Sequence, residues 1–416
     1  MGRAKNWNKI LGPGILFAAT AIGVSHLVQS TKAGSLFGFS LVGFVIAANV
    51  LKFPFFEFGT RYAAATGKSL IQGYAEKSKW WLYVYLLITI PSMFFVTAAV
   101  GVVTEGFMEN LLGLSSLTNI PRFTLYFLFS LCVLILLKGK FNSLEKITKV
   151  LGLALLISSL LTFFSSLWNI KEVEVSYFPS LDKNAWAFLI PLMGWMPTAI
   201  DLSTWNSTWT VEKIKQSGYH PTVKESSKEF QIGYWISAFL AVLFLSIGAL
   251  LVFGSDKVVP QGGVAFSGFI VELFKEGIGT WAGTFISIAA FSIMFSTFIT
   301  VLDGFSRNFT LASQLAIPAI SKNTWYEKFV LFLVAIGGIS LILSFSNNPN
   351  GFSALVNTAT SISFLLAPFI AVFNFKLVQP SSIGEKNSPS RGMNLLAILG
   401  LLYLVGFSLW FLWDLI

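Results

Sequence analysis

Cysteine, histidine and charged side chains are all scarce in this chain of 416 residues. Cys132 is the only cysteine, so the chain can form neither an internal disulfide nor a thiolate metal cluster. Only 11% of the residues are charged, whereas 55% are hydrophobic. A soluble domain of this length needs a larger share of polar residues. The composition therefore excludes a soluble domain and indicates a protein of the lipid bilayer.

Eleven apolar stretches are long enough to cross a bilayer, because about 20 residues rising about 1.5 Å each span a hydrocarbon core of about 30 Å. They lie at 11–32, 36–62, 80–109, 121–138, 147–168, 185–209, 231–254, 278–306, 327–345, 351–375 and 393–415. The first has a charged start but no cleavage site of small residues, so we expect it to be retained. The segments between the spans, of which 210–230 and 255–277 are the largest, are too short to fold alone. We expect an all-α polytopic membrane protein with one transmembrane domain over 1–416.

Lysine and arginine are distributed unevenly over the segments that join the spans. With a cytoplasmic N-terminus, the inner segments carry 21 of the 28 Lys and Arg, the outer segments carry 6, and Lys52 lies inside a span. This is the positive-inside bias of a membrane protein, so the net charge of +9 reflects topology and not nucleic-acid binding. We expect an integral protein of a bacterial inner membrane, with its N-terminus in the cytoplasm and its C-terminus outside.

The first span stops reading as an ordinary helix halfway across. Its stretch LFAATAIGVSHLV places Gly23, Ser25 and His26 at mid-depth. A backbone group without a helical partner is costly in hydrocarbon, so a break there persists only where protein or a water-filled cavity supplies new partners. A broken span is therefore a candidate binding site.

The sixth span repeats this feature. Its stretch AFLIPLMGWMPTAIDLSTW holds Gly194, Pro197 and Asp201, and proline removes a backbone donor, so we expect it to unwind near 196–198. Interrupted spans at matching places in two halves are typical of inverted-repeat transporters, whose site lies at the midplane. We expect five-span halves at 11–168 and 185–375, with 393–415 as an additional helix.

The first two spans resemble those of the NRAMP family of proton-coupled divalent metal transporters. The resemblance lies in GPGILFAATAIGVSHLVQSTKAGSLFGFSLVGFVIAANV and the following TGKSL. The matching positions are Gly12, Gly14, Ala33, Gly34, Phe37, Gly38, Ser40, Leu41, Asn49, Thr66, Gly67 and Lys68. The resemblance implies a leucine-transporter-like fold, with a 5+5 inverted repeat and a site between the broken first and sixth spans.

The chain departs from the family at the residues that would hold a metal ion. Where the family's first span reads Asp-Pro-Gly-Asn, this chain has Gly23, Val24, Ser25 and His26, so the carboxylate is absent. In the sixth span Met196 and Pro197 match the family's Met-Pro-His, and Thr198 replaces its histidine. Ala98 and Gly101 stand where the family's third span has acidic residues tied to proton movement. In the tenth span Thr358, beside Asn357, is nearest to the family's amide ligand.

Three side chains could form a rearranged metal site. His26 offers an imidazole, Met196 a thioether and Asp201 a carboxylate. A carboxylate at bilayer depth is energetically costly, so it usually has a function. The alternatives are a packed His26 bonded to a freed carbonyl of the break, an Asp201 that caps the second half of span six, and a Met196 that only packs. Gly23, Ser25, Thr198 and Thr358 are the further candidates for substrate binding.

Other charged and aromatic residues favour a structural role. Glu57 and Arg61 are four residues apart, as are Asp303 and Arg307, so we expect ion pairs. Lys52 is expected to extend its ammonium group toward the membrane surface. Trp195, Trp205 and Trp209 flank the second break and could either pack between spans or line a solute site.

Transport is the predicted function, and no cofactor is expected. An intramembrane hydrolase is disfavoured because Ser25 and His26 are adjacent, and a nucleophile needs a base from another element. The cargo is predicted to be a divalent metal ion such as manganese or iron. The alternative is a small organic or zwitterionic solute held by the helix ends at the break. Coupling could use protons, through His26 and Asp201, or sodium, through Ser296 and Thr297. The expected partners are the bilayer and the cargo, with no nucleic acid, and the protein is expected to be a monomer.

Overall fold

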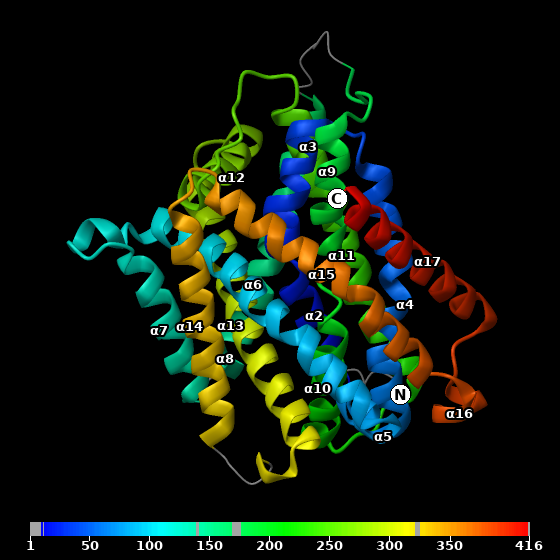
Figure 1. Ribbon diagram of the computed structural model, residues 1–416. Helices are drawn as coiled ribbons and strands as arrows, with labels where there is room; N and C mark the ends of the chain where they lie inside the picture. Colours follow the sequence, from blue (N-terminus) through cyan, green and yellow to red (C-terminus); the bar gives the residue numbers. More distant parts are fainter. Residues whose placement is uncertain (1–9, 11, 139–140, 169–175, 321–324, 415–416) are drawn as a thin grey trace, which may run out of the picture.

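The computed structural model describes residues 10, 12–138, 141–168, 176–320 and 325–414, without the side chains of 141–151 and 168. All regular elements in this part of the chain are helices (Figure 1). The first half contains α2 (Pro13–Ala21), the π-helix η1 (Ser25–Ser30), α3 (Thr31–Phe37), α4 (Val42–Thr66), α5 (Leu70–Lys77), α6 (Lys79–Leu112), η2 (Leu114–Leu117), α7 (Phe123–Leu137) and α8 (Phe141–Trp168). The second half contains α9 (Lys183–Gly194), α10 (Leu202–Ser217), α11 (Val223–Leu251), α12 (Gly263–Ile278), α13 (Ala282–Ala316), η3 (Pro318–Ile320), α14 (Trp325–Ser346), α15 (Gly351–Leu377), α16 (Pro380–Ile383), η4 (Glu385–Asn387) and α17 (Arg391–Asp414).

Each of the eleven predicted spans contains a helix or a broken helix. Seven helices of the described residues are long and apolar enough to cross a bilayer alone, namely α4, α6, α11, α13, α14, α15 and α17. The first span is a pair, α2 and the segment Ser25–Phe37, bent by 43°. Shorter apolar helices at Phe123–Leu137 and Gly152–Leu167 occupy the fourth and fifth spans. The sixth consists of α9 and α10 with an irregular segment between them.

One of the segments between the predicted spans forms a helix of its own. Residues 255–277 contain most of α12, which begins after Gly262. Its Phe266 and Phe274 are buried, and it packs on α6, α8 and α13. The apolar side of this helix therefore covers the bundle. In Figure 1 α12 lies with α3 toward one end, and α5 and α16 lie toward the other.

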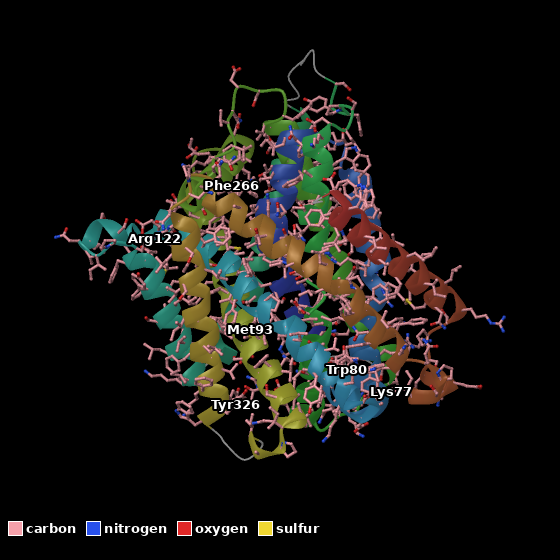
Figure 2. The ribbon with its side chains drawn as sticks, in the orientation of Figure 1. Lys77, Trp80, Met93, Arg122, Phe266 and Tyr326 are labelled. Atoms are coloured by element: carbon pink, nitrogen blue, oxygen red, sulfur yellow. The ribbon has the colours of Figure 1, made fainter. Side chains whose placement is uncertain are left out.

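Charged and aromatic side chains lie at both ends of the bundle. Lys77 and Trp80 lie near one end of the bundle, and Arg122 and Phe266 near the other (Figure 2). Trp80 and Trp413 are 69% and 79% exposed. Tryptophans with this exposure near helix ends fit the interface of a bilayer, where an apolar ring with a polar N–H is favoured.

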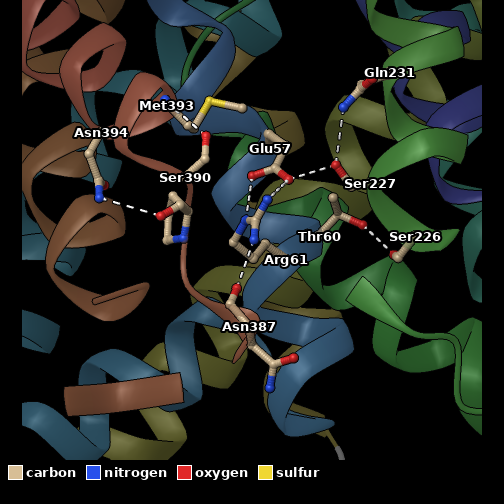
Figure 3. A network of polar contacts seen from close by, with 11 residues as sticks. Glu57, Thr60, Arg61, Ser226, Ser227, Gln231, Asn387, Ser390, Met393 and Asn394 are labelled. Carbon is tan, nitrogen blue, oxygen red and sulfur yellow. Dashed lines mark hydrogen bonds and ion pairs between the residues drawn. The ribbon is translucent and has the colours of Figure 1, made fainter. Parts of the chain in front are cut away.

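The predicted ion pairs are confirmed. Arg61 binds Glu57 through two nitrogens, at 2.7 and 2.9 Å, and donates to the carbonyl of Asn387 at 2.7 Å (Figure 3). Ser227 of α11 donates to the same carboxylate at 2.7 Å. The pair thus joins α4, α11 and the turn before α17. In the same way, Arg307 bonds Asp303 at 2.8 Å and also reaches Glu212 of α10 at 2.9 Å.

Candidate functional site

The first span breaks at Ile22 and Gly23, as the sequence predicts. α2 ends at Ala21 and η1 begins at Ser25, so carbonyls near the end of α2 lose their helical partners. Thr297 of α13 donates to two of them, the carbonyls of Ala19 at 3.2 Å and Ile22 at 3.5 Å. A Cβ atom on Gly23 would lie 3.0 Å from the Thr297 methyl group, so a glycine there allows this close approach.

The sixth span breaks over 195–201, between the end of α9 at Gly194 and the start of α10 at Leu202. The Met196–Pro197 peptide bond in this segment is cis. A Cβ atom on Gly194 would lie 2.1 Å from the carbonyl oxygen of Thr360, so only glycine lets α9 approach α15 this closely. Trp195 donates its ring N–H to the Ser363 hydroxyl, also on α15, at 2.8 Å. The break is therefore fixed against α15 on one side.

Lys52 of α4 fixes the other side of this break. Its ammonium donates to the carbonyls of Met193 at 3.2 Å, Gly194 at 3.0 Å and Thr198 at 3.1 Å. The side chain is fully buried. The expectation that Lys52 reaches toward the membrane surface is therefore wrong, because backbone carbonyls at the break of span six lie within hydrogen-bond reach of its ammonium.

The two breaks face one another across a small void of about 20 Å³. It is lined by Thr20, Ala21, Val24, Ser25, Val96, Val100, Trp195, Thr198, Ala199, Leu202, Thr297 and Val301. Two predicted site residues, Ser25 and Thr198, are thus brought together with the hydroxyls of Thr20 and Thr297. A void of this size holds about one water molecule. The walls are neutral, with hydroxyl groups set among apolar side chains.

His26 turns away from this void. Its Nε2 lies 2.8 Å from the carbonyl oxygen of Ser237 on α11, and its Nδ1 lies 2.7 Å from the Ser25 hydroxyl. A carbonyl oxygen only accepts, so Nε2 carries the proton. The ring is thus bonded to a carbonyl of α11, and the Ser25 hydroxyl beside it donates to the Ala21 carbonyl at the end of α2 at 2.8 Å.

Asp201 lies at the start of α10 but does not cap it. Its carboxylate forms no bond to the first N–H groups of the helix, so the capping alternative is wrong. It accepts instead from the Ser92 hydroxyl of α6 at 2.5 Å. The carboxylate is thus bonded to α6. Trp195 and Trp205 differ in their surroundings. Trp195 lines the void, whereas Trp205 packs edge-on against Phe305.

Met196 is the predicted ligand that lies between the two broken spans. Its sulfur accepts from the Ser30 hydroxyl of span one at 3.7 Å. His26, Met196 and Asp201 therefore bond to α11, span one and α6 respectively, and none of the three lines the void between the breaks. Within the described residues no group of three or more His, Cys, Asp and Glu side chains is placed to hold a metal ion.

Gln29 is a further candidate site residue, which the sequence analysis did not single out. Its amide nitrogen donates to the Asn357 side chain at 3.3 Å and to Thr360 at 3.4 Å, and its buried amide oxygen has no partner in the described part of the chain. The predicted Thr358 is half-buried and projects about 100° away from Asn357 on α15. A glutamine at bilayer depth, one turn after His26, was the available signal, since polar side chains in spans are usually functional.

Known proteins resemble this chain in sequence and in fold. Residues 14–414 match the family model described as natural resistance-associated macrophage protein-like (Nramp). An uncharacterized protein from Pasteurella multocida is 31% identical over 408 residues, covering 97% of this chain and 91% of that protein. A divalent metal cation transporter from Levilactobacillus brevis is 23% identical over 275 residues, covering 64% and 56%. A crystal structure of a manganese transporter from Eremococcus coleocola superimposes with a TM-score of 0.71 at 14% identity, covering 98% and 87%.

Proposed function

This chain belongs to the Nramp family, and from that membership we propose that it is a secondary transporter that moves a divalent metal ion such as manganese or iron by alternating access. Its fold is the leucine-transporter-like fold that the resemblance implied. One observation carries the proposal: two broken spans face each other across the bundle, and a thioether, Met196, lies between them. Thioether sulfur favours transition metals over magnesium and calcium.

The proposed ligand set keeps Met196 at its centre. The amide nitrogen of Gln29 bonds Thr360, whose carbonyl abuts Gly194 at the same break, and the amide oxygen of Gln29 has no partner in the described residues, so we add this oxygen to the set. His26 and Asp201 complete the set only in a conformation that releases them from Ser237 and Ser92. Binding would therefore draw α11 and α6 into the conformational change.

We expect Met196→Leu to lower manganese uptake into proteoliposomes by about tenfold at subsaturating metal, which corresponds to about 1.4 kcal/mol of lost binding free energy. Leucine fills nearly the same volume without a sulfur ligand, so packing is preserved. Met108→Leu is the matched control, because Met108 is equally buried on α6 and away from the breaks. Equal uptake by both variants would remove Met196 from the site, and absence of manganese and iron uptake by the wild type would reject metal transport.

A small zwitterionic solute is the second candidate, favoured by the positive charge of Lys52 at the break and by the neutral hydroxyls around the void. The ammonium would attract a carboxylate and repel a divalent cation. Calorimetry with a panel of divalent metals and amino acids separates the two candidates. Heat from metals alone eliminates the organic solute.

Lys52→Met gives a test whose sign differs between the two candidates. With a metal cargo, removal of the nearby positive charge is expected to tighten manganese binding by about tenfold or more in the fraction of Lys52→Met protein that remains folded. With a carboxylate-bearing cargo, the same substitution weakens binding. Lys376→Met is the control, since Lys376 is exposed near the end of α15 and lies over Trp81. Binding measured by calorimetry at fixed ionic strength decides between them.

We also propose the orientation and the internal repeat predicted from the sequence. The N-terminus would be cytoplasmic in a bacterial inner membrane, on the strength of the excess of lysine and arginine in the inner segments. The two breaks would occupy the first span of each half, 11–168 and 185–375.

A further inference from the structure

The Lys52 ammonium is a buried charge whose described hydrogen-bond partners are all backbone carbonyls. All three of its N–H donors go to span six, at 3.0 to 3.2 Å. Within the described residues no carboxylate lies at ion-pair distance from it. The ring of Phe56, one turn along α4, lies beneath the ammonium with its centroid 6.0 Å away. This lysine therefore forms no ion pair with a carboxylate in the described residues and instead donates hydrogen bonds to backbone carbonyl oxygens.

These oxygens need a positive partner. Met193 and Gly194 are the last two residues of α9, so their carbonyls lie at the negative end of the helix dipole. The Met193 carbonyl also accepts from the Met196 N–H at 3.3 Å. The carbonyl of Thr198 comes from the irregular segment that follows. Three carbonyls converging on one point are also the kind of oxygen ligands that a small free cation takes.

The position of Lys52 is fixed by its surroundings. One turn earlier on α4, the carbonyl of Asn49 accepts from the Tyr234 hydroxyl of α11 at 2.6 Å. Tyr234 is itself packed edge-on against Phe53, with ring centroids 5.1 Å apart. The segment of α4 that carries the lysine is thus held against α11, and the side chain extends from it to the break.

We propose that Lys52 is a tethered cation that occupies, at the break of span six, the place of a diffusible cation. The break is then organised in every molecule without an ion from solution, and wild-type transport does not require sodium at this position. This inference goes beyond the proposed function and does not depend on which cargo is carried.

Chemical rescue tests the proposal. Lys52→Ala removes the ammonium and leaves room for a small cation at the same carbonyls. Its thermal unfolding in detergent is measured in about 100 mM sodium, ethylammonium or choline chloride, where a ligand that binds the folded state raises the midpoint. We expect sodium or ethylammonium to raise the unfolding temperature of this variant saturably over choline. Wild type and Lys376→Ala should show no such difference.

Two further outcomes keep the test decisive. Lys52→Met fills the space without charge, so we expect it to be destabilised and insensitive to all three salts. If Lys52→Ala folds only when purified in sodium or ethylammonium, the proposal is supported. The proposal is overturned if Lys52→Ala ignores the small cations, if it is recovered folded in none of the salts, or if Lys52→Met is as stable as wild type. No metal enters these measurements, so they are independent of the manganese uptake assay.

Discussion

Gly34→Ala is expected to abolish recovery of monodisperse folded protein, whereas Gly43→Ala leaves it unchanged. A Cβ atom on Gly34 would lie 1.8 Å from the carbonyl oxygen of Leu245 and 2.7 Å from the backbone nitrogen of Ala249. On the facing helix, a Cβ atom on Gly248 would lie 2.3 Å from the carbonyl oxygen of Thr31. Both obstacles are backbone atoms that no side-chain rotation can move. The second half of span one, at α3, therefore packs closely on α11 only through glycine, as close helix pairs in membranes do.

The destabilisation expected for Gly34→Ala is opposite in sign to the change that intrinsic helix propensity predicts for a glycine-to-alanine substitution. Alanine is more favourable than glycine within a helix by about 1 kcal/mol, so an unobstructed exchange stabilises. A Cβ atom on Gly43 meets nothing within 4 Å. Size-exclusion profiles and thermal unfolding of both variants in detergent measure the difference. A Gly34→Ala protein as stable as the Gly43→Ala protein would contradict the close packing of α3 on α11.

The breaks could be predicted from the sequence because their causes are local. Pro197 lacks a backbone donor wherever the chain folds, and the run from Gly23 to His26 combines glycine with polar residues at a depth where neither is expected. The match to family motifs then indicated which spans face each other. Both breaks lie where predicted, and Ser25 and Thr198 border a common void.

The partners of the polar side chains could not be predicted, because depth in the bilayer does not determine direction. His26 and Asp201 lie at the same level as the void, yet they bond to Ser237 and Ser92 on helices that the sequence pattern does not place. Lys52 shows the same limit, since its carbonyl partners are more than 140 residues away in the chain. On α15 an uncertainty of one residue in register was enough to exchange Asn357 for Thr358.

Glu229→Ala is expected to release α2, the first half of span one, and to abolish concentrative uptake while leaving cargo binding in place. The Glu229 carboxylate of α11 accepts from the backbone N–H groups of Gly12 at 3.0 Å and Gly14 at 2.9 Å, at the start of α2. Hydrogen bonds to a charged group contribute about 1.5 to 3 kcal/mol each. One turn along α11, a Cβ atom on Gly233 would lie 2.0 Å from the carbonyl oxygen of Gly14. The contact between α2 and α11 therefore depends on the carboxylate and on the absence of a side chain at Gly233.

Because alanine at 229 leaves two backbone donors without their acceptor, the docked arrangement of α2 loses more than 1.4 kcal/mol, which is a factor of more than about ten in population. A single cysteine in place of Val24, which lines the void between the breaks, reports this shift. We expect a membrane-impermeant thiol reagent applied from the side of α2's first turn to label it at least about tenfold faster in Glu229→Ala than in the wild-type background. Glu76→Ala is the control, since Glu76 pairs with Lys68 at an exposed site. Cys132 is fully buried, so it contributes little background labelling. Equal labelling in all three proteins would mean that the contact at Gly233 alone holds α2 on α11. Access to the void would then have to depend on the movement of another helix.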